Sequence, residues 1–258
     1  MIVNKEQCFS ISSFQKEKDL FYLLLQIMDS KKAILSSDLE HYIIGQGDPK
    51  YPIWIWSKNK ISNYEELLED LGHYIIKGEY QITCKKELYE IIKNHYKTSD
   101  YFEMGFLTCS KLIKPSLKKE IFVKINYTDK VVLAEYWREF KKEVDHESIP
   151  QKEALEEVEA WLDKDTFYVL KDSKGDILSL VGYSILGEYA KLSHVYTPLE
   201  YRRKGYCQRA VYELTKILLS KGLKPVLYTN YHYYPSNHAY QKVGYQNKGV
   251  LINFKIMI

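Results

Sequence analysis

A turn rich in positive charge stands directly in front of a helical pattern. In the stretch TPLEYRRKGYC, Arg202, Arg203 and Lys204 precede Gly205, and an apolar-periodic segment follows. A helix N-terminus offers unpaired N–H groups and a partial positive charge, so a strand, a basic glycine turn and a helix together are typical of phosphate sites. Glycine lets the backbone adopt a positive φ angle and lets an anion approach closely. We therefore expect this turn to bind a phosphate group.

The spacing excludes two common phosphate loops, because neither GxxxxGK[ST] nor GxGxxG occurs here. What remains is R-x-x-G-x-C, which Tyr206 and Cys207 complete. An ordinary exposed helix start with solvated charges would contain the same six residues. These residues alone leave both interpretations open, and the elements around them favour the phosphate site.

Those elements form an α/β pattern. Three segments that read as strands, 166–171, 177–186 and 189–197, are joined by the turns DSKGD and GE, which predicts an antiparallel meander. A helix follows the basic turn, and then come a buried strand (PVLYT), a short helix (SNHAYQKV) and a final strand (VLINFKI). Two amphipathic helices precede the meander, the second opened by Ser148 and Pro150. The predicted order is ααβββαβαβ around a mixed sheet.

The first half of the chain also alternates between helical and extended patterns. Helical spacing occurs near residues 14–28, 67–75 and 88–96, and strands are expected at YPIWIWS and MGFLTCS. No glycine-containing basic turn and no catalytic spacing stands out in this half. A lysine-rich segment, 110–130, follows, and we place a domain boundary near residue 128. Residues 1–128 are expected to form a non-catalytic α/β domain, and residues 129–258 are expected to contain the site.

Composition sets the broad class. The 258 residues carry a net charge of +3, 45% are hydrophobic and 28% are charged, as in soluble globular proteins. There is no signal-peptide pattern and no run long enough to cross a bilayer, so we expect a cytoplasmic protein with no membrane partner. The four cysteines lack a CxxC pair and are expected to be reduced thiols. No histidine or cysteine spacing indicates a metal site.

The stretch HVYTPLEYRRKGYCQRAVYELTKILLSKG, followed by PVLYTN and NHAYQKVGY, resembles the GNAT superfamily of N-acetyltransferases. In that family a [QR]-x-x-G-x-[GA] turn lies between a strand and a helix, and a Y-x-x-x-G-[FY] signature, here Tyr240, Gly244 and Tyr245, comes later. The V-Y-T-P-x-x-x-R order resembles bacterial members with an FR47-like C-terminal domain. The resemblance implies a GNAT fold, a mixed and mostly antiparallel sheet flanked by helices. By its length and alternation, the first half resembles a second, degenerate GNAT-like α/β unit.

The resemblance also implies roles for individual residues. Acetyl-CoA would be the acetyl donor, with its pyrophosphate held by Arg202–Cys207 and its pantetheine arm paired with the backbone of His194, Val195 and Tyr196. Tyr240 would protonate the departing thiolate; a tyrosine that only packs on the sheet is the alternative interpretation.

Two features depart from the family pattern. Cys207 occupies a position that is usually glycine or alanine. The segment after PVLYT lacks the usual aspartate and N-P pair, and Asn237 is expected to replace the missing asparagine. No carboxylate lies at the expected strand position, so Glu188, His194 and a water chain all remain open as the general base.

Three functions compete on these residues. The first is an N-acetyltransferase, monomeric or homodimeric, that acetylates a primary amine of a small acceptor. The second is a CoA-binding regulatory or sensor protein without turnover, which Cys207 and the missing carboxylate would suit. A nucleic-acid-binding module is the least favoured, because the cations are compact and the net charge is small; no nucleic-acid partner is expected.

Overall fold

The chain divides into two compact units. The computed structural model describes residues 1–59, 61, 64–116 and 120–258. The first unit comprises residues 1–107, 228–233 and 247–258, and the second comprises residues 108–227 and 234–246. The boundary expected near residue 128 does not match this division, because the chain leaves the first unit at residue 107 and its final strand returns there. Residues 117–119 of the lysine-rich segment lie outside the described residues.

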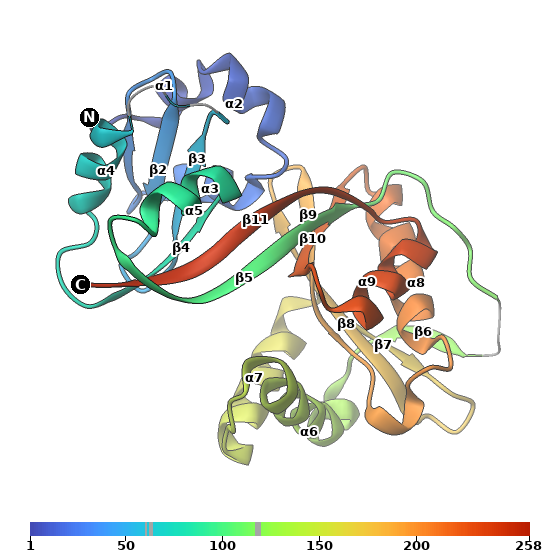
Figure 1. Ribbon diagram of the computed structural model, residues 1–258. Coiled ribbons are helices and arrows are strands. Elements are labelled where there is room, and N and C mark those ends of the chain that lie inside the picture. The colour runs from blue at the N-terminus through green and yellow to red at the C-terminus, as the bar shows by residue number, and fades with distance from the viewer. Residues whose placement is uncertain (60, 62–63, 117–119) are drawn as a thin grey trace. The chain divides into compact units, whose positions relative to one another are not determined.

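In the first unit, helices cover a sheet (Figure 1). Its elements are α1 (Lys5–Phe9), α2 (Ser12–Glu17), α3 (Tyr22–Met28), β1 (Ile34–Ser37), β2 (Tyr42–Gln46), β3 (Ile53–Ser57), α4 (Glu65–Gly72), β4 (Glu79–Cys84), α5 (Lys86–Ile92), β5 (Lys97–Thr108) and β11 (Gln246–Met257). The strand order is β1-β2-β3-β4-β11-β5. Strands β1, β2 and β3 pair antiparallel, and β4 runs parallel to β3 after the crossover through α4.

The sheet of the first unit is buried on both faces. Successive strand residues point to opposite faces. Ile44 and Ile55 accordingly pack with residues of α4 and α5, whereas their neighbours Ile43 and Trp56 pack with residues of α1, α2 and α3. The sequences of β2 and β3 therefore show unbroken apolar runs rather than alternating patterns.

Strand β11 completes the first unit from the far end of the sequence. It pairs antiparallel with β4 from Ile252 opposite Cys84 to Met257 opposite Glu79. The amide of Asn253 adds two polar contacts, donating to Thr83 Oγ1 (2.8 Å) and accepting from the Gln81 amide (2.6 Å). A domain boundary at residue 128 does not describe this unit, because its sheet includes a strand from the second half of the chain.

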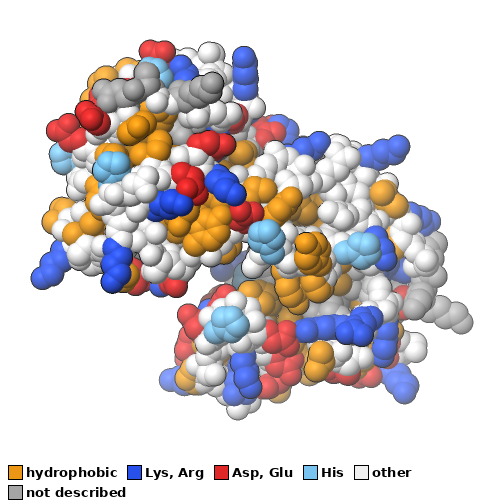
Figure 2. Space-filling model, viewed as in Figure 1, with side chains coloured by type: hydrophobic (Ala, Val, Ile, Leu, Met, Phe, Trp, Pro, Cys, Tyr) orange, Lys and Arg blue, Asp and Glu red, His pale blue; other side chains and the backbone are white. Residues whose placement is uncertain are grey.

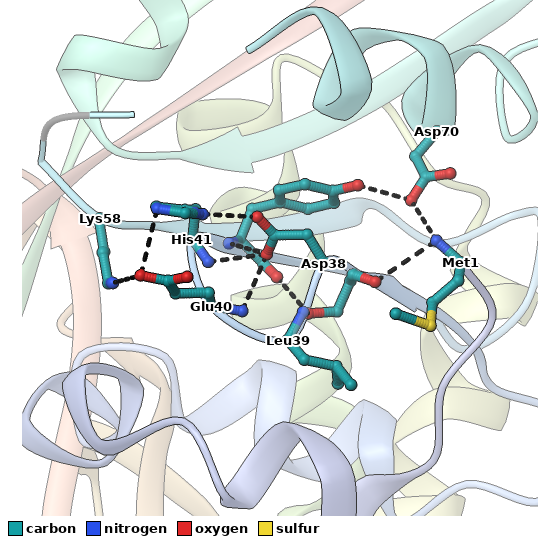
Figure 3. A network of polar contacts seen from close by, with 9 residues as sticks. Met1, Asp38, Leu39, Glu40, His41, Lys58 and Asp70 are labelled. Atoms are coloured by element: carbon teal, nitrogen blue, oxygen red, sulfur yellow. Dashed lines mark hydrogen bonds and ion pairs between the residues drawn. The ribbon is translucent and has the colours of Figure 1, made fainter. Parts of the chain in front are cut away.

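A polar network ties the start of β2 to its surroundings (Figure 3). The carboxylate of Asp38 accepts hydrogen bonds from the backbone N–H groups of Glu40, His41 and Tyr42 and lies 2.7 Å from His41 Nδ1. Asp70 accepts from the Tyr42 hydroxyl (2.7 Å) and from the amino group of the first residue (3.0 Å). Although burial opposes ionisation, the backbone and His41 hydrogen bonds leave the pKa of Asp38 below its usual value.

The second unit contains the first eight elements of the predicted order, ααβββαβα, and one further strand, β6, before them; the predicted final strand, β11, belongs to the first unit. Its elements are β6 (Ile121–Lys124), a 3₁₀ turn (Tyr127–Asp129), α6 (Lys130–Phe140), a π-helical turn (Lys141–Asp145), α7 (Gln151–Lys164), β7 (Phe167–Lys171), β8 (Ile177–Leu186), β9 (Tyr189–Tyr196), a 3₁₀ turn (Leu199–Tyr201), α8 (Tyr206–Ser220), β10 (Lys224–Asn230) and α9 (Tyr234–Val243). The antiparallel meander β7-β8-β9 is confirmed, β6 pairs antiparallel with β7, and β10 runs parallel to β9.

Helices cover both faces of this second sheet (Figure 1). Helices α6 and α7 pack on one face around Trp161, Phe167 and Leu180, while α8 packs on the sheet from the other side. Gly182 lies directly under the Phe167 ring, where an added Cβ atom would come within 2.6 Å of a ring carbon. Strand β9 therefore has α6 and α7 on one face of the sheet and α8, the helix that follows the basic turn, on the other.

Two local predictions were wrong. The spacing over residues 14–28 does not form one helix, since α2 ends at Glu17 and α3 begins at Tyr22. Pro150 is the N-cap of α7 and no side-chain hydrogen bond caps the helix, so Ser148 does not have the expected capping role.

Candidate functional site

The basic turn leads into α8 with the geometry of an uncapped helix start. Gly205 is the N-cap residue and has φ +86° and ψ +4°, in the left-handed region. It has no side chain that could cap the first N–H groups of the helix, and the first helical hydrogen bond runs from Arg209 N to Gly205 O (3.0 Å). An added Cβ atom at Gly205 would meet no described heavy atom within 4 Å. The backbone angle of the turn thus favours glycine. The space that a side chain at this position would occupy is open.

The three cations before Gly205 are not equivalent. Arg202 is held within the protein: its Nε donates to Thr197 O (2.8 Å), its Nη2 lies 2.6 Å from Glu143, and its guanidinium lies 5.6 Å from the Tyr196 ring centroid. Lys204 is exposed, with its ammonium 5.8 Å from the Tyr201 ring centroid. Arg203 is exposed and has φ +61°. Arg203 and Lys204 are therefore the cations placed to meet an anion, and Arg202 fixes the strand end to the turn after α6.

A pocket of about 210 Å³ lies beside the first turn of α8. It is lined by Pro115, Ser116, Glu120, Lys204, Gly205, Tyr206, Gln208 and Arg209. Arg209 is largely buried there, 3.6 Å from Glu120 and 3.2 Å from Glu213. The pocket combines an open helix N-terminus with one exposed lysine.

Strand β9 is irregular at its C-terminal end. Gly182 pairs with Ser193 but Leu180 pairs with Tyr196, so β9 has an extra residue between these two pairs, and His194 has φ +53°. The carbonyl of Tyr196 accepts from the Ser179 hydroxyl (3.0 Å). The described pairing of β9 with β10 covers Tyr189–Lys191, and the strand continues five residues further. The bulge thus falls on His194 and Val195, two of the three residues that the sequence placed against the pantetheine arm, and Tyr196 pairs with Leu180 directly after it.

The His194 ring is enclosed by aromatic side chains. Its centroid lies 5.0 Å from Trp137, 5.1 Å from Trp161 and 5.3 Å from Phe167, and Phe140 is the fourth ring nearby. Burial lowers the pKa of His194 to about 4, and its Nδ1 atom has no hydrogen-bond partner among the described residues. The ring is therefore neutral at pH 7 and is a poor proton acceptor there.

Tyr240 and Cys207 lie close together. Tyr240, on α9, is buried, and its ring is 6.0 Å from that of Tyr245, whose hydroxyl is 2.8 Å from Thr215 Oγ1. Burial raises the pKa of Tyr240 far above its usual value, and the neighbouring Cys207 thiol adds to this. Burial also raises the pKa of Cys207 to about 11. Both groups are protonated at neutral pH, and Tyr240 keeps a proton that it could donate.

Asn237 lies one helical turn before Tyr240 on α9 and is half-buried. Residues three apart share one face of a helix. The structure therefore brings Asn237, Tyr240 and Cys207 to the α8–α9 side, and His194 and Tyr196 to the α6–α7 side of the same unit.

Sequence reasoning missed Glu139. This residue of α6 is half-buried, and its carboxylate accepts a hydrogen bond from the Tyr196 hydroxyl (2.7 Å). In the sequence it is one of two glutamates on α6, and only the contact of α6 with β9 distinguishes it. Glu188, a candidate base in the sequence, instead lies 3.0 Å from Lys224.

Charge is mixed on the face of the molecule that Figure 2 shows, where acidic and basic side chains are interspersed. Among the described residues, no group of three or more His, Cys, Asp and Glu side chains could hold a metal ion. None of the helices that the structure describes is long and apolar enough to cross a membrane.

Comparisons with known proteins show what this region is similar to. The sequence model of the acetyltransferase (GNAT) family matches residues 130–245, which include α6 to α9 and the basic turn. No curated protein matches the sequence.

Several solved structures share the fold. A GNAT-family acetyltransferase from Colwellia psychrerythraea has a TM-score of 0.59 at 10% identity, covering 99% of this chain and 98% of its own. A GCN5-related N-acetyltransferase from Kribbella flavida has a TM-score of 0.59 at 10% identity, covering 92% and 95%. One from Sphaerobacter thermophilus has a TM-score of 0.59 at 9% identity, covering 87% and 80%. These likenesses confirm the mixed α/β fold with a helix-flanked sheet, and residues 130–245 match the model of the acetyltransferase (GNAT) family.

Proposed function

We propose that this protein transfers an acetyl group from acetyl-CoA to a primary amine of a small acceptor. The observation that carries the proposal is the start of α8, where Gly205 at φ +86° supplies no side-chain cap and leaves the space beyond it open. Exposed Arg203 and Lys204 add positive charge beside this helix end. A pyrophosphate suits such a place, since it can accept several N–H bonds and meets a favourable dipole.

The other site residues fit the same reaction. The bulge at His194 and Val195 interrupts the regular pairing of β9, so this backbone can bond to the donor and polarise its thioester carbonyl. Tyr240, kept neutral by burial, can protonate the departing thiolate. The chain's own contribution is to hold the two reactants in line and to supply and remove protons.

The first unit is proposed to be a degenerate GNAT-like half without a donor site. Its β3–α4–β4 crossover, with β3 and β4 parallel, has the same order as β9–α8–β10 in the second unit. The sequence between β3 and α4, residues 58–64, has no glycine. The V-Y-T-P-x-x-x-R order supports an FR47-like second half.

A CoA-binding sensor without turnover is the second candidate. It is favoured by Cys207, which places a protonated thiol where the family pattern has glycine or alanine. Both candidates bind acetyl-CoA, and they differ in whether an amine is acetylated.

Two measurements test these proposals. Calorimetric titration with acetyl-CoA should give one site per chain; no binding would contradict both candidates, and two sites would contradict the assignment of the first unit. Release of CoA thiol is then followed with n-butylamine, spermidine, glycinamide and an alanine-terminated peptide. Release above the acceptor-free rate supports the transferase, and binding without release supports the sensor.

A further inference from the structure

Tyr196, which is buried, and Glu139, which is half-buried, form a hydrogen-bonded pair at the bulged end of β9. The Tyr196 hydroxyl donates to Glu139 Oε2 at 2.7 Å. The Tyr196 ring is 5% exposed and packs 5.9 Å from the Tyr136 ring and 6.1 Å from the Phe140 ring. Burial and the Glu139 carboxylate raise the pKa of Tyr196 far above its usual value. The tyrosine is therefore neutral, and its proton points to the carboxylate.

Glu139 differs from the other carboxylate facing Tyr196. Glu143, in the π-helical turn after α6, is paired with Arg202. Glu139 has no cation within ion-pair distance among the residues that the structure describes. A half-buried carboxylate whose hydrogen-bond partner is a hydroxyl group can still take up a proton, whereas one neutralised by arginine does so less readily.

Strand β9 itself supplies no better proton acceptor. His194 sits in its aromatic enclosure with a pKa of about 4. Lys191, at the position expected for a strand carboxylate, is a half-buried cation. The structure thus supplies a carboxylate from α6 where β9 has none.

We propose that Tyr196 and Glu139 together remove the proton that the acceptor amine loses during acetylation, an inference that rests on the proposed function. The amine nitrogen bonds to the acetyl carbon, the carbon–sulfur bond breaks, and the electron pair goes to sulfur. The amine proton passes to the Tyr196 oxygen while the Tyr196 proton passes to Glu139. Tyr240 protonates the thiolate, and Glu139 later releases its proton to water. Tyr196 is the catalytic residue that touches the amine, and Glu139 acts through it.

The test uses the full chain, acetyl-CoA and whichever amine of the panel gives the fastest CoA release. Glu139→Gln keeps an oxygen that can accept from Tyr196 but cannot take a proton. We expect kcat to fall by about 10²–10³-fold, with acetyl-CoA affinity and melting temperature unchanged. Sodium formate should restore part of the rate to Glu139→Ala, because the small carboxylate can enter the vacated space. Tyr196→Phe should lower kcat as much, and the double variant should be no slower than either single one.

Glu135→Ala is the matched control. This residue precedes Glu139 by one turn of α6, is exposed and pairs with Arg138. We expect its kcat to be that of the unmodified protein and to be insensitive to formate.

Three results would overturn the inference. If the unmodified protein binds acetyl-CoA but acetylates no amine, the proposed function fails and the inference fails with it. If that protein turns over and Glu139→Gln turns over equally fast, the inference alone fails. The inference alone also fails if Glu139→Ala is inactive and formate restores nothing, because the carboxylate then has a structural role.

Discussion

At the scale of single residues, Gly205 has a positive φ angle that favours glycine, and the space beside it is open. Substitutions can distinguish the strain of the φ angle from the loss of that space. Valine at φ +86° is strained by about 1–2 kcal/mol and places methyl groups where a phosphate must approach. We expect Gly205→Val to weaken acetyl-CoA binding at least tenfold, which is about 1.4 kcal/mol, by calorimetry.

Gly222 provides the matched control for that substitution. It follows the other end of α8 at φ +72°, and an added Cβ atom there also meets nothing within 4 Å. Gly222→Val should cost similar stability and leave acetyl-CoA affinity unchanged. Equal affinity in folded Gly205→Val and Gly222→Val proteins would remove the turn from the donor site.

Tyr240 should matter for chemistry rather than for binding. Tyr240→Phe keeps the ring against Tyr245, so melting temperature and acetyl-CoA affinity should hardly change, while kcat falls by about 10²–10⁴-fold. All three quantities are measured on the one variant with an accepted amine. A lower melting temperature with kcat intact would show that the tyrosine only packs.

His194 should make the second unit sensitive to acid. Its pKa is about 4 when folded against an ordinary value of 6.5, so the unfolded chain binds more protons between these values. The free energy of unfolding should therefore fall as pH decreases from about 6.5 to about 4, by about 3 kcal/mol from this residue. His194→Phe keeps an aromatic ring and should remove that part of the loss. Denaturation followed by the fluorescence of Trp137 and Trp161 measures it, and parallel pH curves for the two proteins would disprove the assignment.

At the scale of elements, the end of α9 depends on a close backbone approach. An added Cβ atom at Gly244 would lie 2.1 Å from Lys111 O, and Gly244 has φ +108°. Gly244→Ala must therefore displace the segment that donates from Ile113 N to Val243 O. We expect it to destabilise the second unit by about 1–3 kcal/mol beyond the cost of its φ angle.

Gly175 in the β7–β8 turn isolates that φ cost. It has φ +92° and open space beyond it, so Gly175→Ala should cost only about 1 kcal/mol or slightly more. Urea denaturation of both variants gives the comparison. Equal urea midpoints for the two variants would show that the segment containing Lys111 moves at no measurable cost in stability.

Periodicity predicted the helices of the second unit because α6, α7, α8 and α9 each have one polar face. The meander was predicted as apolar runs joined by glycine-containing turns, since β7 and most of β8 are buried on both faces. Strand β2 is buried on both faces and shows no alternation, and it was missed; β3 is equally buried, but the turn-like GQGDPK before it marked its start. Strand β6 was missed within a lysine-rich segment. The basic turn could be found in sequence because its residues are contiguous. Glu139 could not, since its role depends on which strand α6 contacts.

At the scale of the whole molecule, one strand links the stability of the first unit to the end of the sequence. Phe254 of β11 is fully buried, with its ring 4.8 Å from that of Tyr89. Phe254→Ala should destabilise the first unit by about 3–5 kcal/mol and leave the second nearly unchanged. Two tryptophans lie in each unit, so variants that retain only Trp54 and Trp56, or only Trp137 and Trp161, report the units separately.

Phe102, on β5 of the same unit, is the control. It is exposed, and Phe102→Ala should change stability by less than about 0.5 kcal/mol. If Phe254→Ala instead lowered both transitions equally, the two units would unfold as one.

The pairing of β4 with β11 also determines the order in which the protein can fold as it is made. Asn253 bonds to Thr83 across 170 positions of the sequence. At about 5–20 residues per second, a ribosome needs roughly 10–30 seconds to translate that interval. For that time β4 has emerged without its antiparallel neighbour, and an unpaired strand edge can pair with other chains. The unit that is synthesised first is therefore the unit that folds last.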